Sequence, residues 1–202
     1  MISGMVFVAI EQHLRDAGDG ALAAECFPVH GQYIALGEYP ELDVLEIAGR
    51  ISRAPVDPAT AAFAGDGLRH RPLVDVLRAL GEAVPRVVSR IAPALLPRAD
   101  GFQALLAQLE RGEQMLGRGL LPDVEVRRRP GGLVAVVDRS PAGLCRFTEG
   151  MLLGHATLLS DSVAFRHSSC RSRGDADCTL VVRFLRAETT VSARPPARRR
   201  DD

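Results

Sequence analysis

The stretch "RSPAGLCRFTEGMLLGHATLL", residues 139–159, decides the fold, because it is the one helical segment in an otherwise strand-like C-terminal third. Its apolar residues recur at spacings of three and four positions, which predicts a helix with one buried face. Ser140 can cap the first turn, and Pro141 suits the first helical position. We therefore predict a helix that begins directly after Ser140.

Strand-like segments flank this helix on both sides. "DVEVRRR" (123–129) and "GLVAVVDRS" (132–140) alternate in polarity or are rich in β-branched residues, and "PGG" between them is a hairpin signal. "SVAFRHSS" (162–169) and "CTLVVRFL" (178–185) follow the helix and are joined across "RSRGDAD". The order strand, strand, helix, strand, strand predicts an antiparallel sheet with the helix packed on it.

The chain before residue 118 has helical periodicity. Apolar residues recur at helical spacing in four segments, at 6–17, 42–52, 72–96 and 101–116. Pro85 and Pro93 interrupt the third segment, which predicts two helices or a kinked one. The fold class is therefore α+β, with an N-terminal helical lobe followed by a C-terminal antiparallel sheet and its packed helix.

We expect one domain over residues 1–186, because this length suits a single core. Its helical lobe would span 1–118 and its α/β lobe 119–186. The polar, proline-rich residues 187–202 have the composition of a disordered tail.

The composition argues against several classes of function. Acidic and basic side chains number 25 each, whereas a nucleic-acid partner requires a basic face. No stretch reaches the roughly 18 uninterrupted apolar residues of a membrane span, and residues 1–14 lack the basic start of a secretory signal. We therefore expect a cytoplasmic protein without nucleic-acid or membrane partners, with its four cysteines reduced.

The segment "HSSCRSRGDADC", residues 167–178, is the candidate metal site. It holds His167, Cys170 and Cys178, and Cys145 lies 22 positions before the histidine, near the start of the predicted helix. Thiolate and imidazole are the ligands that zinc prefers, and a structural zinc site uses four of them. We predict a zinc site of three cysteines and one histidine, and we expect the helix start to favour the Cys145 thiolate.

Two other interpretations of these cysteines remain open. A Cys170–Cys178 disulfide fits the turn between them, although it conflicts with a reducing compartment. The thiols could also be unrelated small core residues, as we expect for Cys26 in the helical lobe. The remaining histidines have no partner at ligand spacing, and we interpret them as surface or satisfied interior residues; they are His13, His30, His70 and His155.

Several segments between Met5 and about Phe184 resemble the H-NOX, or heme–nitric-oxide-binding, family. The most specific is "RSPAGLCRFTEGMLLGHA" (139–156), followed by the cysteine–histidine cluster. The others lie at 31–49, 72–88 and 91–110. The resemblance implies the same order of elements. A zinc-carrying bacterial subset has three cysteines and one histidine at similar spacing, and the more distantly related 4-vinyl-reductase-type ligand-sensing domains use a similar cluster.

The resemblance also implies a heme site, whose residues are changed here. In heme-binding members a histidine ligates the iron, and counting back from Pro122 puts Gln114 at that position. A neutral amide is a poor iron ligand. A Tyr-x-Ser-x-Arg motif holds the propionates, and its positions here are Asp138, Ser140 and Ala142. An aspartate repels propionates, and the arginine that would bind them is missing. We therefore expect heme not to bind in the family's manner.

Three functional hypotheses follow. The first is a heme-independent signalling or sensor domain with a structural zinc site, or one whose cysteines also respond to oxidation. The second is a heme-binding nitric-oxide or gas sensor that uses a different iron ligand. The third is a regulatory domain that binds an apolar small molecule.

We expect no enzyme, because four protein ligands leave zinc no open position for water. The sequence also has no nucleophile elbow and no phosphate-binding loop. The resemblance implies a signalling partner such as a histidine kinase, a diguanylate cyclase or a chemoreceptor.

Overall fold

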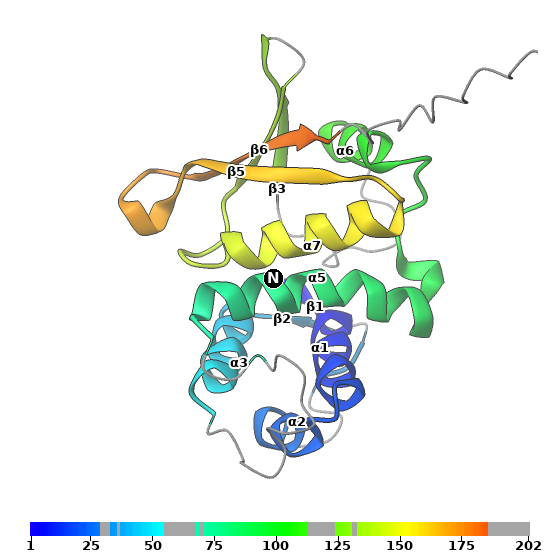
Figure 1. Cartoon of the computed structure of the whole chain (residues 1–202), viewed down its shortest axis with the longest axis vertical. Coiled ribbons are helices and arrows are strands. Elements are labelled where there is room, and N and C mark those ends of the chain that lie inside the picture. The colour runs from blue at the N-terminus through cyan, green and yellow to red at the C-terminus, as the bar shows by residue number, and fades with distance from the viewer. Residues whose placement is uncertain are drawn as a thin grey trace, which may run out of the picture.

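The predicted C-terminal sheet forms as four antiparallel strands (Figure 1). The structure is a computed structural model and describes residues 1–28, 33–35, 37–54, 68, 71–112, 124–130 and 133–185. The strands are β3 (Val124–Arg128), β4 (Val134–Asp138), β5 (Val163–Ser169) and β6 (Cys178–Phe184). Their order across the sheet is β3-β4-β6-β5. The α+β fold class is therefore confirmed, and the tail predicted over 187–202 lies outside the described residues.

The register of the sheet places its apolar side chains on one face. Val126 is opposite Val136, and Val136 is opposite Leu180 on the next strand. Successive strand residues point to opposite faces, so positions in such a row share one face. These three residues belong to one buried cluster with Leu152 and Ala156 of the helix that covers the sheet. Burial of this face is what holds the helix on the sheet.

The covering helix is α7 (Cys145–Leu158), which lies along the sheet in Figure 1. It begins at Cys145, so the predicted start after Ser140 is wrong. The backbone N–H of Ser140 instead donates to Asp138 Oδ1 at 2.8 Å, and turn residues separate it from the helix. The correction makes Cys145 the first residue of α7.

The N-terminal part is a helical lobe that lies on the other side of α7 from the sheet (Figure 1). A buried apolar cluster joins its helices to the first turns of α7, through Leu144, Phe147 and Met151. A two-stranded pairing, which the sequence did not predict, closes the lobe at its start. The elements are β1 (Ile2–Ser3), α1 (Gly4–Asp16), α2 (Gly20–Cys26), β2 (Glu38–Tyr39), α3 (Leu42–Arg53) and α5 (Leu73–Ile91).

Helix α5 continues through Pro85, so of the two predicted alternatives, two helices or one kinked helix, a division into two helices does not occur at this residue. Proline costs a helix one N–H donor and crowds the preceding turn. Pro85 is nevertheless buried, and its ring lies against Gly154 of α7, where a Cβ would be 3.0 Å from the proline Cγ. The helix does end before Pro93, which opens the short 3-10 turn η1 (Pro93–Leu95).

Helices α5 and α7 approach so closely that their backbones touch. A Cβ on Gly150 of α7 would lie 2.0 Å from the carbonyl oxygen of Arg78, and one on Gly81 of α5 would lie 2.2 Å from that of Phe147. Real Cβ atoms are essentially never found at such distances. The contact between the two lobes therefore depends on glycine at both positions.

Helix α6 (Phe102–Glu110) packs with the sheet. Its buried side chains Phe102, Leu105 and Leu106 belong to the same cluster as Val136 and Leu180. The expected lobe boundary near residue 118 would assign α6 to the helical lobe. Its buried side chains instead contact the strands of the C-terminal sheet. None of the described helices has both the length and the apolar character needed to cross a membrane.

Candidate metal centre

The end of β5 and the start of β6 form a tight turn that carries three of the four predicted ligands. His167 lies on β5 beside a β-bulge, where the pairing with β6 shifts between residues 167 and 169. Bulges re-aim side chains at the ends of strands. Cys170 follows, then the 3-10 turn η3 (Arg171–Arg173) and Gly174, whose φ of 91° is readily adopted only by glycine. Cys178 begins β6.

Side-chain hydrogen bonds fix this turn. Asp175 Oδ2 accepts the backbone N–H of Cys170 at 2.7 Å. The N–H of Arg171 donates to the sulfur of Cys178 at 3.3 Å. Hydrogen bonds to Cys170 and Cys178 therefore hold the turn that carries the two sulfurs.

Helix α7 brings the third cysteine to this turn. The sulfurs of Cys145 and Cys170 are 3.7 Å apart, as are those of Cys170 and Cys178. All three are free thiols and buried, so the disulfide interpretation does not describe this structure. Two thiolates on a tetrahedral zinc ion, each about 2.3 Å from the metal, are about 3.8 Å apart. The observed spacing therefore fits shared coordination.

His167 completes the cluster on one side. One ring nitrogen of His167 and the sulfurs of Cys145 and Cys170 all lie within 4.8 Å of one another. Cys178 is close to Cys170 but is not in this mutually close set. The structure thus brings three predicted ligands together, with Cys178 adjacent to them.

The three thiols have different acidities. Burial raises the pKa of Cys145, and the neighbouring thiols raise it further. We expected the helix start to lower the pKa of Cys145. In the metal-free site, burial and the neighbouring thiols raise this pKa instead. Burial also raises the pKa of Cys178. At Cys170 burial acts in the same direction, but hydrogen bonds from Ser172 outweigh it and lower the pKa to about 6.

A buried carboxylate lies next to the cluster and was not predicted. Glu149 is only 4% exposed, and its Oε2 is 2.9 Å from Nε2 of His167. Arg146 and Arg78 form ion pairs with the same carboxylate at 2.9 and 3.4 Å. Burial opposes ionisation, yet the bonds from His167 and Arg146 keep the pKa of Glu149 below its ordinary value. Its position one helical turn after Cys145 is a signal that could have found it.

The positions of the family's propionate motif form a closed hydrogen-bonded set. Asp138 is 1% exposed, and its two oxygens accept from the N–H of Ser140 at 2.8 Å and from the Thr148 hydroxyl at 2.7 Å. Ser140 is buried as well. A buried carboxylate that accepts two hydrogen bonds offers no positive charge or donor to a propionate.

No described cation replaces the arginine of that motif. Ala142 is exposed, and Arg139 lies on the outside of the sheet, where it pairs with Glu125 at 2.8 Å. The nearby Arg171 donates to the carbonyl oxygens of residues 139 and 140, at 3.0 and 3.1 Å. The predicted positions Gln114 and Pro122, and the histidines His30 and His70, lie outside the described residues.

His155 of α7 differs from the expected satisfied histidine. It is 3% exposed, and its Nε2 has no hydrogen-bond partner among the residues that the structure describes. Burial lowers the pKa of His155 to about 4, so the ring is neutral at pH 7. The apolar side of α7 thus contains an uncharged imidazole.

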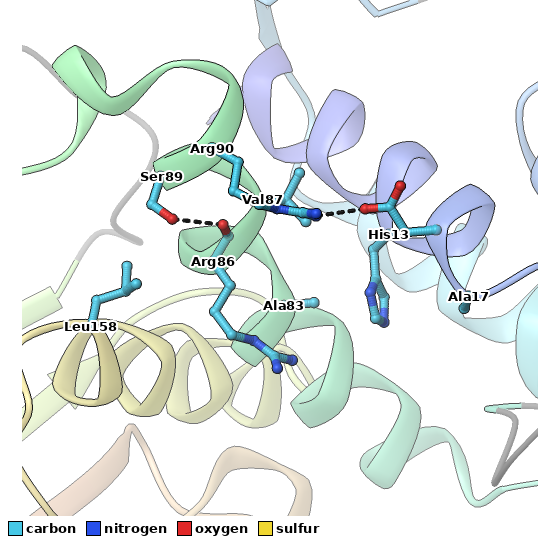
Figure 2. A pocket seen from close by; sticks show the side chains of 9 residues that line it. His13, Ala17, Ala83, Arg86, Val87, Ser89, Arg90 and Leu158 are labelled. Carbon is cyan, nitrogen blue, oxygen red and sulfur yellow. Dashed lines mark hydrogen bonds and ion pairs between the residues drawn. The ribbon is translucent and has the colours of Figure 1, made fainter.

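A separate groove lies where α1, α5 and the end of α7 meet (Figure 2). Its volume is about 570 Å³ and it is open to solvent. His13 and Arg86 both line it, and Arg90 spans it to reach Asp16 at 2.5 Å. Burial and then the charge of Arg86 lower the pKa of His13. The groove contains none of the predicted site residues. It is open to solvent, whereas sites for apolar small molecules enclose most of the ligand.

Comparison with known proteins identifies the fold. No protein-family model matches the sequence, and no curated protein matches it either. Among solved structures, an H-NOX protein from S. oneidensis in the Fe(II)NO ligation state has a TM-score of 0.70 at 18% identity. The match covers 92% of this chain and 100% of that one.

Two further solved structures have the same architecture. The Fe(II) unliganded H-NOX protein from K. algicida has a TM-score of 0.65 at 14% identity, over 93% of this chain and 98% of its own. An oxygen-binding H-NOX domain related to soluble guanylate cyclases has a TM-score of 0.60 at 11% identity, over 92% and 96%. The chain therefore has the H-NOX fold, as the sequence resemblance implied.

Proposed function

We propose that this protein is a signalling or sensor domain of H-NOX fold that holds a structural zinc ion and does not bind heme in the manner of the H-NOX family. The observation that carries the proposal is the convergence of Cys145, His167 and Cys170 within 4.8 Å. Cys178 is the fourth ligand, since its sulfur is 3.7 Å from that of Cys170. Four protein ligands leave no open position, so the role is structural and not catalytic.

Zinc binding would link parts of the lobe that are distant in sequence. Zinc supplies a fixed tetrahedral centre for thiolate and imidazole ligands, and it keeps its thiolates deprotonated. Cys145 belongs to α7, His167 to β5 and Cys178 to β6. These residues would therefore tie the helix to both strands of the β5–β6 hairpin.

The absence of family-type heme binding is supported by the propionate positions. Asp138 is buried and its oxygens are used by Ser140 and Thr148. Gln114, at the position of the iron ligand, has a neutral amide. In this proposal the domain transmits signals by contact with another protein. The partner is a separate signalling protein such as a histidine kinase, a diguanylate cyclase or a chemoreceptor.

Metal analysis and a hemin titration of the same purified sample test the proposal. We expect about one zinc per chain. We also expect no sharp Soret band and no spectral change with nitric oxide. A protein without transition metal contradicts the zinc site, and a Soret band that shifts with nitric oxide contradicts the loss of heme.

The second candidate function, a heme-based gas sensor with another iron ligand, is favoured by one observation. His155 is buried and neutral, and its Nε2 has no described partner, which are the properties of an iron ligand. If hemin does bind, the His155→Ala variant decides whether this residue is the ligand. Loss of the Soret band in that variant alone would establish the second candidate.

Cys170→Ser tests whether the metal stabilises the C-terminal lobe. We expect this variant to lower the free energy of unfolding of the zinc-loaded protein by about 2 kcal/mol, which corresponds to a 30-fold weaker metal affinity. The same comparison in excess chelator is the control, and there the difference between variant and parent should nearly vanish. Equal losses with and without chelator would mean that Cys170 contributes only packing.

A further inference from the structure

Glu149 is a deeply buried charged side chain next to the metal centre. Its side chain is 5% exposed and contacts three basic groups, one on each of three elements. Arg78 comes from α5, Arg146 from α7 itself and His167 from β5. Burial of a carboxylate is costly unless its oxygens are paired. These three basic groups pair with the Glu149 oxygens at the point where α5, α7 and β5 meet.

The two ring nitrogens of His167 have different surroundings. Nε2 is 2.9 Å from the Glu149 carboxylate, which can only accept while it is ionised, so Nε2 carries the hydrogen. Nδ1 is buried and has no hydrogen-bond partner among the described residues. The side chain is 8% exposed, so water does not readily serve Nδ1. A buried, unprotonated nitrogen requires a partner. One ring nitrogen of His167 lies within 4.8 Å of the sulfurs of Cys145 and Cys170, so a metal ion bound to these sulfurs could be that partner.

We infer that Glu149 is the positioning residue of the metal centre: it holds His167 as the Nε2–H tautomer, so that Nδ1 is the atom that binds the zinc. This inference rests on the zinc site proposed above and adds the ligand atom and the residue that selects it. Histidine ligands commonly donate their second N–H to a carboxylate, which fixes the ring and makes the bound nitrogen more basic. Glu149 is not itself in the set of potential ligands within 4.8 Å.

The same carboxylate connects the metal centre to the helical lobe. Arg78 lies on α5, and its guanidinium reaches Glu149 at 3.4 Å. The Arg78 backbone also contacts Gly150 of α7. Glu149 therefore contacts both His167 on β5 and Arg78 on α5.

Nitrogen NMR of the zinc-loaded parent protein tests the ligand atom without any substitution. Long-range proton–nitrogen spectra of the His167 ring separate a metal-bound nitrogen from a protonated one. We expect Nδ1 to have the shift of the metal-bound nitrogen and Nε2 that of N–H. Coordination through Nε2 would overturn the inference. This measurement remains decisive even if variants at 149 fail to fold.

Glu149→Gln tests the positioning role by metal affinity. We expect the zinc dissociation constant, measured by competition with a chromophoric chelator, to rise about 10-fold or more. The Co(II) absorption bands should keep their tetrahedral thiolate character, because the ligands are unchanged. Glu125→Gln is the matched control, since Glu125 also binds two arginines but no histidine. Its affinity should equal that of the parent.

The outcomes distinguish this inference from the function on which it rests. If the parent takes up no zinc, the proposed function fails. If the parent binds zinc and Glu149→Gln binds it equally well, only the role of Glu149 fails. A purely structural role would lower the stability of the metal-free protein and leave the zinc affinity and the ring tautomer unchanged.

Discussion

Gly150→Ala is expected to lower the free energy of unfolding by about 3 kcal/mol, at the upper end of the cost of overpacking a core. The added Cβ would lie 2.0 Å from the carbonyl oxygen of Arg78 and 2.8 Å from the backbone nitrogen of Glu82. Both atoms belong to the α5 backbone, which cannot rotate away as a side chain can. Helices α5 and α7 must therefore separate, and the apolar contacts around Phe147 and Met151 weaken with them.

Urea denaturation of Gly150→Ala and of a control variant measures this effect. Gly20→Ala is the control, because Gly20 also lies in a helix and no described atom lies within 4 Å of an added Cβ. Alanine favours a helix over glycine, so the control should be neutral or slightly more stable. Equal stabilities of the two variants would show that the helices can move apart at little cost.

The metal-free protein is expected to lose about 2 kcal/mol of stability between pH 7 and pH 4.5 through one buried histidine. Burial lowers the pKa of His155 from the ordinary 6.5 to about 4. Below pH 6.5 the unfolded chain therefore binds a proton that the folded chain does not. The free energy of unfolding is therefore highest above pH 6.5, where His155 is neutral in both states, and it falls as the pH approaches 4.

Chemical denaturation across this pH range, in excess chelator, isolates the contribution of His155 from metal binding. His155→Leu should remove most of the pH dependence. His13→Asn should remove less, since His13 is only half-buried although its pKa is lowered as well. An undiminished pH dependence in His155→Leu would place the proton uptake elsewhere.

Much of the fold could be predicted because periodicity and β-branching report directly on burial. All four strands of the sheet and the helix between them were found in this way. The start of α7 was missed because Ser140 and Pro141 have the composition of a helix start but form a turn in which Ser140 bonds Asp138. The sequence left open whether Pro85 divides the helix, because the packing of its ring against Gly154 is a tertiary contact.

The cluster of potential metal ligands was predictable from residue type and spacing, and its surroundings were not. Cysteines and a histidine near one turn point to shared coordination whatever the exact geometry. Glu149 was missed because a glutamate on a helix is usually exposed, and only the three-dimensional fold brings Arg78 and His167 to it. The pKa of Cys145 was not predictable either. Burial raises this pKa, although the position at a helix start was expected to lower it.

The position of β6 in the middle of the sheet has a consequence for how the chain is synthesised. β6 (Cys178–Phe184) pairs with both β4 and β5, so the strand that joins the sheet together is the last of its four strands to be synthesised. The helices of the first hundred residues can fold during translation. The sheet cannot close until β6 has been synthesised, and a nascent chain that ends before residue 178 also lacks one of the proposed zinc-binding sulfurs.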